Sequence, residues 1–217
     1  KMQKNKKIYP QYIKRLLDIA LSIIAIIILS PIYILVSILV LIFMGWPILF
    51  IQPRPGKNEK IFNIYKFRTM TNKKDKEGNL LPDKQRINKF GEFLRRSSID
   101  ELPELFCILI GTMSIVGPRP LAVAYLPYYN DNERHRHDVR PGLTGLAQVN
   151  GRNALQWEKR FKYDLEYVNN ISFMMDFKII ISTIQKVFKR ENIVLSGTGK
   201  IEDFHKYRKK QLEKNNK

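Results

Sequence analysis

The chain has 217 residues, a length that suits one domain with a sizeable core plus a small membrane-attachment element, and a second large domain is not expected. Lysine and arginine number 38 against 20 aspartates and glutamates, giving a formal net charge of +18 at pH 7. Such an excess predicts a polyanionic partner: nucleic acid, anionic lipid or pyrophosphate. Cys107 is the only cysteine, which excludes an internal disulfide, and its apolar neighbours predict a buried side chain rather than a reactive thiol.

The first long feature along the chain is an apolar segment. Residues 19 to 51 contain no charged side chain, and residues 19 to 44 are apolar on every face of a helix. This pattern predicts a membrane helix. The segment is long, has no small-residue cleavage site and leads into a basic stretch, so we expect it to stay attached rather than act as a cleaved signal peptide.

Ser30 and Pro31 interrupt this segment near its middle. Proline removes one helical N–H group and crowds the carbonyl of Ile27, so we expect a bend, with the Ser30 hydroxyl bonding back to the carbonyl of Ile26. Each resulting arm is shorter than the about 20 residues that a straight span requires.

Basic residues flank the apolar segment at both ends, and short basic flanks favour the cytoplasmic side of a membrane. A re-entrant helix that enters and leaves on the cytoplasmic face satisfies both ends. Composition leaves one alternative open, an ordinary proline-kinked transmembrane helix. The flanking residues are Lys4, Lys6, Lys7, Lys14 and Arg15 before the segment and Arg54, Lys57, Lys60 and Lys66 after it.

The rest of the sequence predicts a helix-rich α+β fold. We expect a basic N-terminus with the re-entrant helix at 1 to 52, a cytoplasmic catalytic domain at 53 to 200, and a basic tail at 201 to 217 that is either disordered or in contact with anionic lipid. In chain order, the catalytic part begins with a strand at 61 to 70 and a charged surface loop at 72 to 89. Helices follow at 90 to 96 and at 97 to 111, the second ending at Gly111, and then a strand at 113 to 117. The remaining segments, 121 to 133 and 153 to 190, are mainly helical, and a glycine-containing stretch at 140 to 153 separates them.

The stretch SSIDELPEL, residues 97 to 105, places Asp100 and Glu101 at a helix start. In a structural interpretation, Ser98 is the N-cap and Glu101 completes a capping box. In a chemical interpretation, the free N–H groups bind a phosphate, and Mg²⁺ relieves its repulsion with the carboxylates. Asp100 would then be the nucleophile and Glu101 its metal-binding neighbour.

Several basic residues lie at the boundaries of the predicted elements, and convergence on one anion would explain their placement. Taken singly, each is equally well explained as a solvated surface residue. Arg119 lies between two prolines, on a stiff loop that suits presentation of its guanidinium to phosphate oxygens. The residues concerned include Lys66, Arg95, Arg119 and Arg152.

Two further patterns are weak. The sequence HRHD at 135 to 138 has no additional Cys or His cluster to complete a metal site. SGTGK at 196 to 200 lacks the full phosphate-loop pattern because Ile201 follows the lysine, so we expect a turn.

Six features together resemble the bacterial sugar transferase family, the monotopic phosphoglycosyl transferases. The resemblance extends in order from about residue 14 to 189, and the lack of extra N-terminal membrane helices makes the chain similar to the small members. Within that group, YLPYYN (125 to 130), HRHDVRPG (135 to 142) and SFMMDFKI (172 to 179) resemble the transferases that start N-linked protein glycosylation with diacetylated bacillosamine phosphate. The features are KRLLDI (14 to 19), the Ser30–Pro31 break, YKFRTM (65 to 70), LRRSSIDELPEL (94 to 105), MSIVGPRP (113 to 120) and RPGLTGLAQVNGRN (140 to 153).

The resemblance implies that the Asp100 carboxylate attacks the β-phosphate of a UDP-sugar, releases UMP and holds the phosphosugar covalently until polyprenol (undecaprenyl) phosphate takes it. The implied donor is an N-acetylated amino sugar such as UDP-N,N′-diacetylbacillosamine, in the first membrane step of glycan or glycoprotein assembly. Glu101 is implied to hold the cofactor Mg²⁺. The remaining residues implied at the site are Lys66, Arg95, Arg119 and Arg152 as anion contacts, and Asp176 as an acidic position without an assigned role.

The implied location is the cytoplasmic face of the bacterial inner membrane, where the positive charge contacts anionic lipid. A homo-oligomer is left open, and no nucleic-acid partner is expected. A membrane-tethered nucleic-acid binder would require stacking aromatic residues interleaved with lysine, which only residues 61 to 67 resemble. A non-enzymatic membrane adaptor would leave the Asp100–Glu101 pair without a role.

Overall fold

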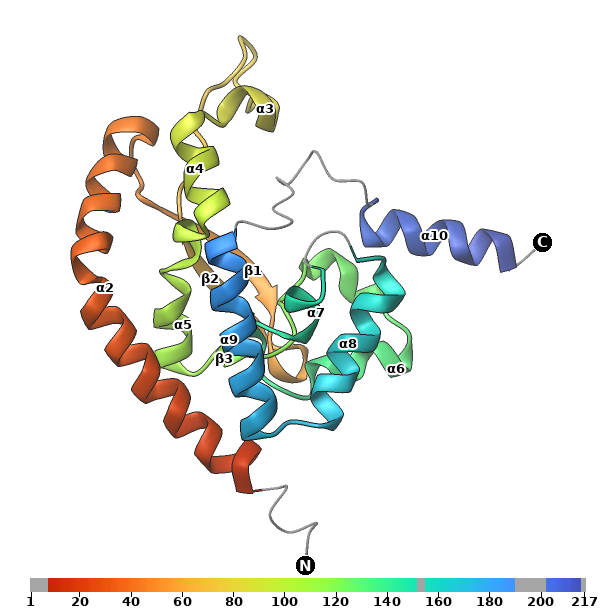
Figure 1. Ribbon diagram of the computed structural model, residues 1–217. Helices are drawn as coiled ribbons and strands as arrows, with labels where there is room; N and C mark the ends of the chain where they lie inside the picture. Colours follow the sequence, from red (N-terminus) through yellow and green to blue (C-terminus); the bar gives the residue numbers. More distant parts are fainter. Residues whose placement is uncertain (1–7, 152–154, 190–201, 216–217) are drawn as a thin grey trace, which may run out of the picture.

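The computed structural model describes residues 8–151, 155–189 and 202–215, and within them the chain forms the helix-rich α+β fold that the sequence predicts (Figure 1). The strands are β1 (Leu49–Pro55), β2 (Ile61–Phe67), β3 (Ser114–Val116) and β4 (Gly142–Thr144). The α-helices are α2 (Lys14–Met44), α3 (Asp83–Arg86), α4 (Lys89–Ser97), α5 (Glu104–Ile110), α6 (Asp131–Arg134), α7 (Leu146–Val149), α8 (Trp157–Asn169), α9 (Phe173–Lys189) and α10 (Phe204–Asn215). A π-helical turn, η1 (Tyr9–Ile13), precedes α2, and 3-10 turns are η2 (Lys57–Glu59), η3 (Ile99–Glu101), η4 (Val123–Tyr128) and η5 (His135–His137).

The apolar segment forms one long helix, α2, which curves along one side of the molecule (Figure 1). Val36 and Val40 on its inner face are buried against Phe67 and Leu94, whereas outer side chains such as Ile28 remain exposed. With η1 it is the one helix in the described part of the chain that is long and apolar enough to cross a membrane, and its mean hydropathy reaches 3.0. The exposed aliphatic surface suits contact with lipid.

Pro31 lies inside α2 without ending it. The Ser30 hydroxyl donates a hydrogen bond of 2.8 Å to the carbonyl of Ile27, not to that of Ile26 as expected. Ile27 is the residue whose carbonyl would otherwise accept from the N–H group that proline lacks, so the serine replaces the missing donor. This bond explains how the helix continues through the Ser-Pro break.

Two small sheets hold the domain together. The β1–β2 hairpin is antiparallel, whereas β3 and β4 pair in parallel. The sequence predicts β2 and β3 correctly but not β1, since Pro53 and Pro55 remove two backbone donors from it. The 72 to 89 stretch is a largely exposed loop that includes the short helix α3.

The parallel β3–β4 pair depends on glycines. A Cβ atom on Gly142 would lie 2.1 Å from the backbone nitrogen of Gly117, and one on Gly145 would lie 2.1 Å from the Gly117 carbonyl oxygen. Any larger residue would push these backbones apart. The close approach fixes the turn that carries Arg119, two residues after Gly117.

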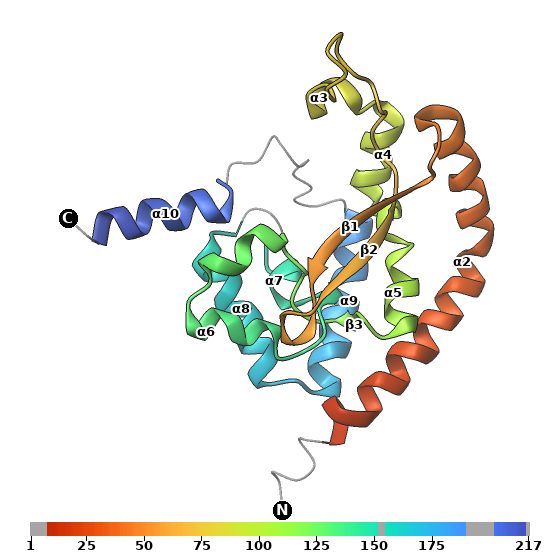
Figure 2. The ribbon, with the colours of Figure 1, turned by 180° about the vertical axis from the view of Figure 1, so that it is seen from behind.

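The C-terminal tail contains an ordered helix rather than only disordered chain. Helix α10 projects from the side of the molecule opposite α2 (Figures 1 and 2). Its first residue, Phe204, is fully buried among Tyr129, Trp157 and Phe161, and the Trp157 indole donates to the carbonyl of Glu202 at 2.9 Å. Aromatic packing therefore holds the first turn of α10 against the domain. The basic composition of the tail did not predict this contact.

Candidate active site

The acidic pair lies in a short turn, not in the first turn of one long helix. Ser98 adopts a left-handed conformation, with φ of 58°, that closes α4, and its side chain makes no capping hydrogen bond. Asp100 and Glu101 follow in η3, and α5 begins only at Glu104. The capping-box interpretation is therefore wrong, because a left-handed residue turns the chain and the Glu101 side chain bonds elsewhere.

Glu101 is the centre of a charge cluster built from three elements. Lys66, on β2, donates to its Oε1 atom at 2.7 Å and also lies 3.1 Å from the carboxylate of Glu104. Arg119, in the loop after β3, donates to both Glu101 oxygens, at 2.5 Å and 3.4 Å. Two of the predicted basic residues thus converge on the predicted acidic pair.

The two neighbouring carboxylates have opposite pKa shifts. Burial acts to raise the pKa of Glu101, but the charges of Arg119 and Lys66 outweigh it and hold that pKa well below its usual range. Burial, reinforced by the charge of Glu101, raises the pKa of Asp100 to about 7. Such a divided pair, one carboxylate fixed as an anion and one that exchanges a proton near neutral pH, is typical of catalytic sites.

The other predicted residues divide into three groups. Arg95, on α4, donates to the Thr69 hydroxyl at 2.9 Å, and its charge acts on Asp100. Asp176 lies apart from the cluster: it is buried on α9 and accepts hydrogen bonds from Tyr9, Lys14 and Tyr167. Arg152, like the predicted turn at 196 to 200, lies outside the described residues.

Sequence reasoning missed the group that holds the Arg119 loop. Arg136 is buried, pairs with Asp164 on α8 at 2.8 Å, and donates to the carbonyl of Arg119, also at 2.8 Å. It belongs to the HRHD sequence, where only the histidines had suggested a function. Glu104 was also missed, because nothing in SSIDELPEL marks it as more than a helix residue.

The residues present fit a magnesium ion of the kind that substrate phosphates help to hold. Mg²⁺ prefers carboxylate oxygens and commonly takes one or two of them, with phosphate oxygens and water completing its shell. Asp100 and Glu101 offer such oxygens. No cluster of three or more His, Cys, Asp or Glu side chains arranged to hold a metal occurs among the described residues, HRHD included.

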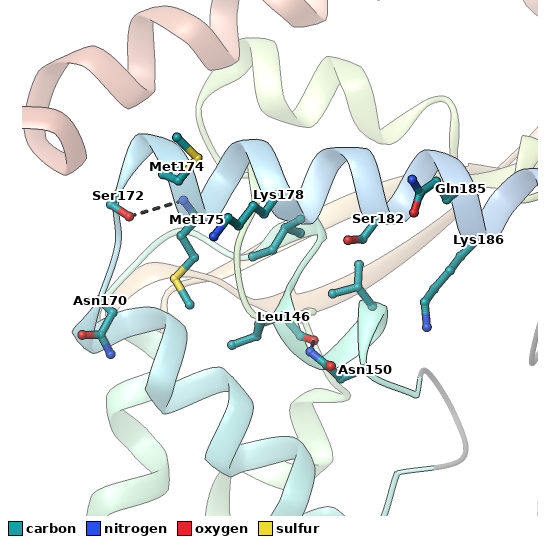
Figure 3. A pocket seen from close by; sticks show the side chains of 12 residues that line it. Leu146, Asn150, Asn170, Ser172, Met174, Met175, Lys178, Ser182, Gln185 and Lys186 are labelled. Carbon is teal, nitrogen blue, oxygen red and sulfur yellow. Dashed lines mark hydrogen bonds between the residues drawn. The ribbon is translucent and has the colours of Figure 1, made fainter.

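A separate cavity of about 530 Å³ opens between α7 and α9 (Figure 3). Leu146 on α7 and Asn150 just after it line one side, and Met175, Lys178 and Lys186 line the other side from α9. Among the residues that the structure describes, neither an acidic side chain nor a predicted site residue borders it. The acidic turn, not this cavity, therefore carries the groups that can perform chemistry.

Comparison with known proteins assigns this chain to a family. The family described as bacterial sugar transferase matches residues 9–190. The uncharacterized sugar transferase EpsL of Bacillus subtilis (strain 168) is 48% identical over 181 residues, which cover 83% of this chain and 90% of that protein. The exopolysaccharide production protein PSS of Rhizobium leguminosarum bv. phaseoli is 38% identical over 190 residues, covering 79% of this chain and 93% of that protein.

A longer relative has a name that states its reaction. The UDP-glucose:undecaprenyl-phosphate glucose-1-phosphate transferase of Klebsiella pneumoniae is 41% identical over 185 residues, covering 81% of this chain but only 40% of that protein. The chain spans less than half of such longer relatives and nearly all of EpsL and PSS. It belongs to the bacterial sugar transferase family, as its motifs indicate, and is a phosphoglycosyl transferase.

Proposed function

We propose that this enzyme transfers a sugar 1-phosphate from a UDP-sugar to undecaprenyl phosphate through a covalent intermediate on Asp100. The observation that carries the proposal is the Asp100–Glu101 pair, whose second carboxylate is held between Lys66 and Arg119. Relatives whose names specify transfer of glucose 1-phosphate to undecaprenyl phosphate support the substrate classes.

In the first half of the reaction, an ionised Asp100 oxygen attacks the β-phosphorus of the donor. The bond from that phosphorus to the oxygen bridging to UMP breaks, and UMP leaves with the electron pair. Because the pKa of Asp100 is about 7, a large part of the carboxyl groups is ionised at neutral pH. In the second half, a phosphate oxygen of undecaprenyl phosphate attacks the same phosphorus and Asp100 is released unchanged.

Lys66 and Arg119 serve this chemistry by their charge. Arg119 presents a planar fork that suits two phosphate oxygens, and its contact with Glu101 keeps the fork oriented before substrate arrives. Mg²⁺ bound through Glu101 would reduce the repulsion between the carboxylates and the pyrophosphate. Arg95 and Arg152 are proposed to add positive charge, while Asp176 has contacts that favour anchoring the start of α2.

The membrane arrangement is part of the proposal. The exposed aliphatic surface of α2 lies in the lipid, and the basic residues at both ends favour a re-entrant path from the cytoplasmic face of the inner membrane. A catalytic part that lies at the level of the lipid head groups meets the phosphate of a polyprenol carrier there. The net charge of +18 favours anionic lipid around the enzyme.

The motifs and the relatives favour different donors. The motif resemblance favours an N-acetylated amino sugar such as UDP-N,N′-diacetylbacillosamine, whereas several relatives are named for UDP-glucose. We propose the amino sugar. A side-by-side panel decides, because specificity is a ratio of kcat/KM values, and a clear preference for UDP-glucose or UDP-galactose would exclude our choice.

The test of the function combines UMP release with intact mass. Wild-type protein given the preferred UDP-sugar without acceptor should gain the mass of one phosphosugar and release one equivalent of UMP. Asp100→Asn should lose both. Asp138→Asn, at a carboxylate that is 58% exposed, is the matched control and should behave as wild type. Full turnover by Asp100→Asn would exclude the covalent intermediate on Asp100. No UMP release from any UDP-sugar would exclude the transfer reaction itself and favour a non-enzymatic adaptor.

A further inference from the structure

Arg54, on β1, is a largely enclosed guanidinium without a carboxylate partner. Its Nη2 atom donates to the side-chain oxygen of Gln52 at 2.6 Å, and its Nε atom is buried with no hydrogen-bond partner. Within the described residues it forms no ion pair. A buried donor and a buried charge are both unfavourable when they lack partners, so this position is arranged for an anion that comes from outside the chain.

Arg54 also lies close to another cation. Strand β1 packs against η4, and burial together with the charge of Arg119 lowers the pKa of Arg54, although the charge of Glu104, which forms no ion pair with Arg54, acts in the opposite direction. Arg119 has Glu101 as its own partner. Two guanidiniums in electrostatic range of each other repel, unless an anion lies between them and bonds to both.

A third arginine reaches the same region from α8. The Arg160 guanidinium stacks on the Trp157 ring at 4.4 Å from its centroid, and the Tyr125 ring of η4 meets that indole edge-on at 5.7 Å. Arg160 lies one helical turn before Asp164, on the same face of α8. Through its pair with Asp164, Arg136 fixes the carbonyl of Arg119, so the helix that carries Arg160 also positions the Arg119 loop.

We propose that Arg54, Arg119 and Arg160 form a subsite for the phosphate monoester of the leaving nucleotide, UMP. The proposal rests on the proposed function, because UMP is the product of its first half-reaction. Arg119 would contact both the β-phosphate under attack and the phosphate that leaves, while Arg54 and Arg160 contact only the latter. The positive charge stabilises the dianion that forms as the pyrophosphate bond breaks.

A phosphate monoester is also the head group of undecaprenyl phosphate, so the same chemistry has two sources. The placement of the subsite favours the nucleotide. Helix α8 lies across the β1–β2 hairpin from α2 in both views (Figures 1 and 2). A lipid phosphate that stays at the membrane surface beside α2 approaches from the opposite side.

The test measures UMP binding to the full-length protein in lipid nanodiscs by isothermal titration, without any donor sugar. Arg54→Gln is expected to weaken UMP binding by roughly tenfold or more, as expected for the loss of hydrogen bonds between charged groups. The KM for undecaprenyl phosphate should stay within about twofold, since a lost contact affects only the ligand that makes it. The matched control is Arg86→Gln, which removes a similarly enclosed arginine from the distant helix α3 and should bind UMP as wild type.

Two further variants keep the test decisive. If Arg54→Gln does not fold, Arg160→Gln and Arg54→Lys are measured in its place, and both should weaken UMP binding. Unchanged UMP affinity in folded variants would overturn the proposal, and so would a rise in KM for undecaprenyl phosphate alone, which would assign the subsite to the lipid. UMP binding that depends on Arg54 in a protein that transfers sugar phosphate from no donor would sustain the subsite and exclude the proposed function.

Discussion

The hydroxyl of Tyr33, on the apolar helix α2, donates a hydrogen bond of 2.6 Å to the carbonyl oxygen of Leu102. Leu102 directly follows Glu101 in the chain, and Tyr33 comes two residues after Pro31. The Ser-Pro region of the proposed membrane helix is therefore bonded to the backbone next to the predicted reactive carboxylates. A change in the path of α2 is expected to reach the catalytic turn through this bond.

Tyr33→Phe tests that connection. The ring keeps its packing, but the Leu102 carbonyl loses a donor, which destabilises a folded protein by about 1 kcal/mol. We expect kcat to fall several-fold while the melting temperature falls by only a few degrees, because the bond positions η3 rather than a large core. Tyr12→Phe is the control, since the Tyr12 side chain is 61% exposed and its hydroxyl accepts a hydrogen bond from the neighbouring Gln11. Equal kcat in the two variants would contradict a positioning role.

Magnesium dependence follows from the proposed role of Glu101. Chelation by EDTA should stop UMP release, and added Mg²⁺ should restore it. In Glu101→Gln the Mg²⁺ concentration for half-maximal activity should rise by roughly tenfold or more, since even the partners of metal ligands contribute roughly tenfold to a hundredfold in affinity. A titration of UMP release against free Mg²⁺ measures it. An unshifted titration would remove Glu101 from the metal site.

Gly142→Ala is expected to destabilise the fold. The added Cβ would lie 2.1 Å from the Gly117 nitrogen and 2.4 Å from the Thr144 carbonyl oxygen, and neither backbone atom can rotate away. Such overpacking destabilises by about 1–3 kcal/mol, and urea unfolding should show it. Gly78→Ala, in an open loop with no atom within 4 Å of its Cβ position, should lose about 1 kcal/mol or less, from its positive φ alone.

Local sequence patterns predicted part of this fold for clear physical reasons. Strand β2 alternates apolar side chains, and Gly111 ends α5 with φ of 101°, a conformation that glycine adopts without strain. Cys107 is buried, as its apolar neighbours predicted. Each of these features depends on a few adjacent residues, which is the information that a single sequence carries.

Contacts between distant segments were not predictable in the same way. Ser98 satisfied the pattern of an N-cap, but it is instead the C-cap of α4, in a left-handed conformation, with its N–H group bonded to the carbonyls of Arg95 and Leu94. Tyr33 and Leu102 are 69 positions apart, so no spacing indicates their bond. The convergence of Lys66 and Arg119 was expected from element boundaries, yet their shared partner, Glu101, appears only when β2, η3 and the loop after β3 are placed together.

The stability of the enzyme should fall in mild acid because of His137. Burial and the charge of Arg136 lower the His137 pKa to about 3. The Nε2 atom lies 3.4 Å from an Arg136 nitrogen, which is always a donor, so Nε2 remains unprotonated there. Glu59 lies 3.5 Å from Nδ1, but it is partly exposed and shared with Arg134, so it does not offset these effects. Folded His137 stays neutral while the unfolded histidine takes up a proton.

Because the unfolded state binds more protons below about pH 6.5, unfolding becomes easier as the pH falls from there toward 3, by up to about 1.4 kcal/mol per pH unit. Above that window His137 contributes no pH dependence. Urea unfolding at pH 7.5, 6.5 and 5.5 measures the effect, and His137→Gln should reduce the slope between the last two. His135→Gln, at a side chain that is 64% exposed, should keep the wild-type slope. An unchanged slope in His137→Gln would assign the acid sensitivity to other groups.

The final prediction concerns the path of α2 in the membrane. If the segment is re-entrant, the chain on both sides of it lies in the cytoplasm, in agreement with the basic flanks. Replacing Ser30 by Ala and Pro31 by Leu restores a backbone N–H group and removes the ring that crowds Ile27, so α2, which is already long enough to cross the bilayer, can straighten and span it. One flank of the variant should then move to the periplasmic side.

Single cysteines near residues 4 and 57, in a protein whose Cys107 is replaced, report this topology through a membrane-impermeant thiol reagent. In intact cells carrying the parent sequence, both positions should remain unlabelled until the inner membrane is opened. In the Ser30→Ala, Pro31→Leu variant, one position should become labelled in intact cells. The parent supplies the control for access, since both cysteines must react after lysis. Labelling of either flank of the parent in sealed cells would show that α2 spans the membrane, and the re-entrant proposal would then be replaced by the proline-kinked transmembrane helix.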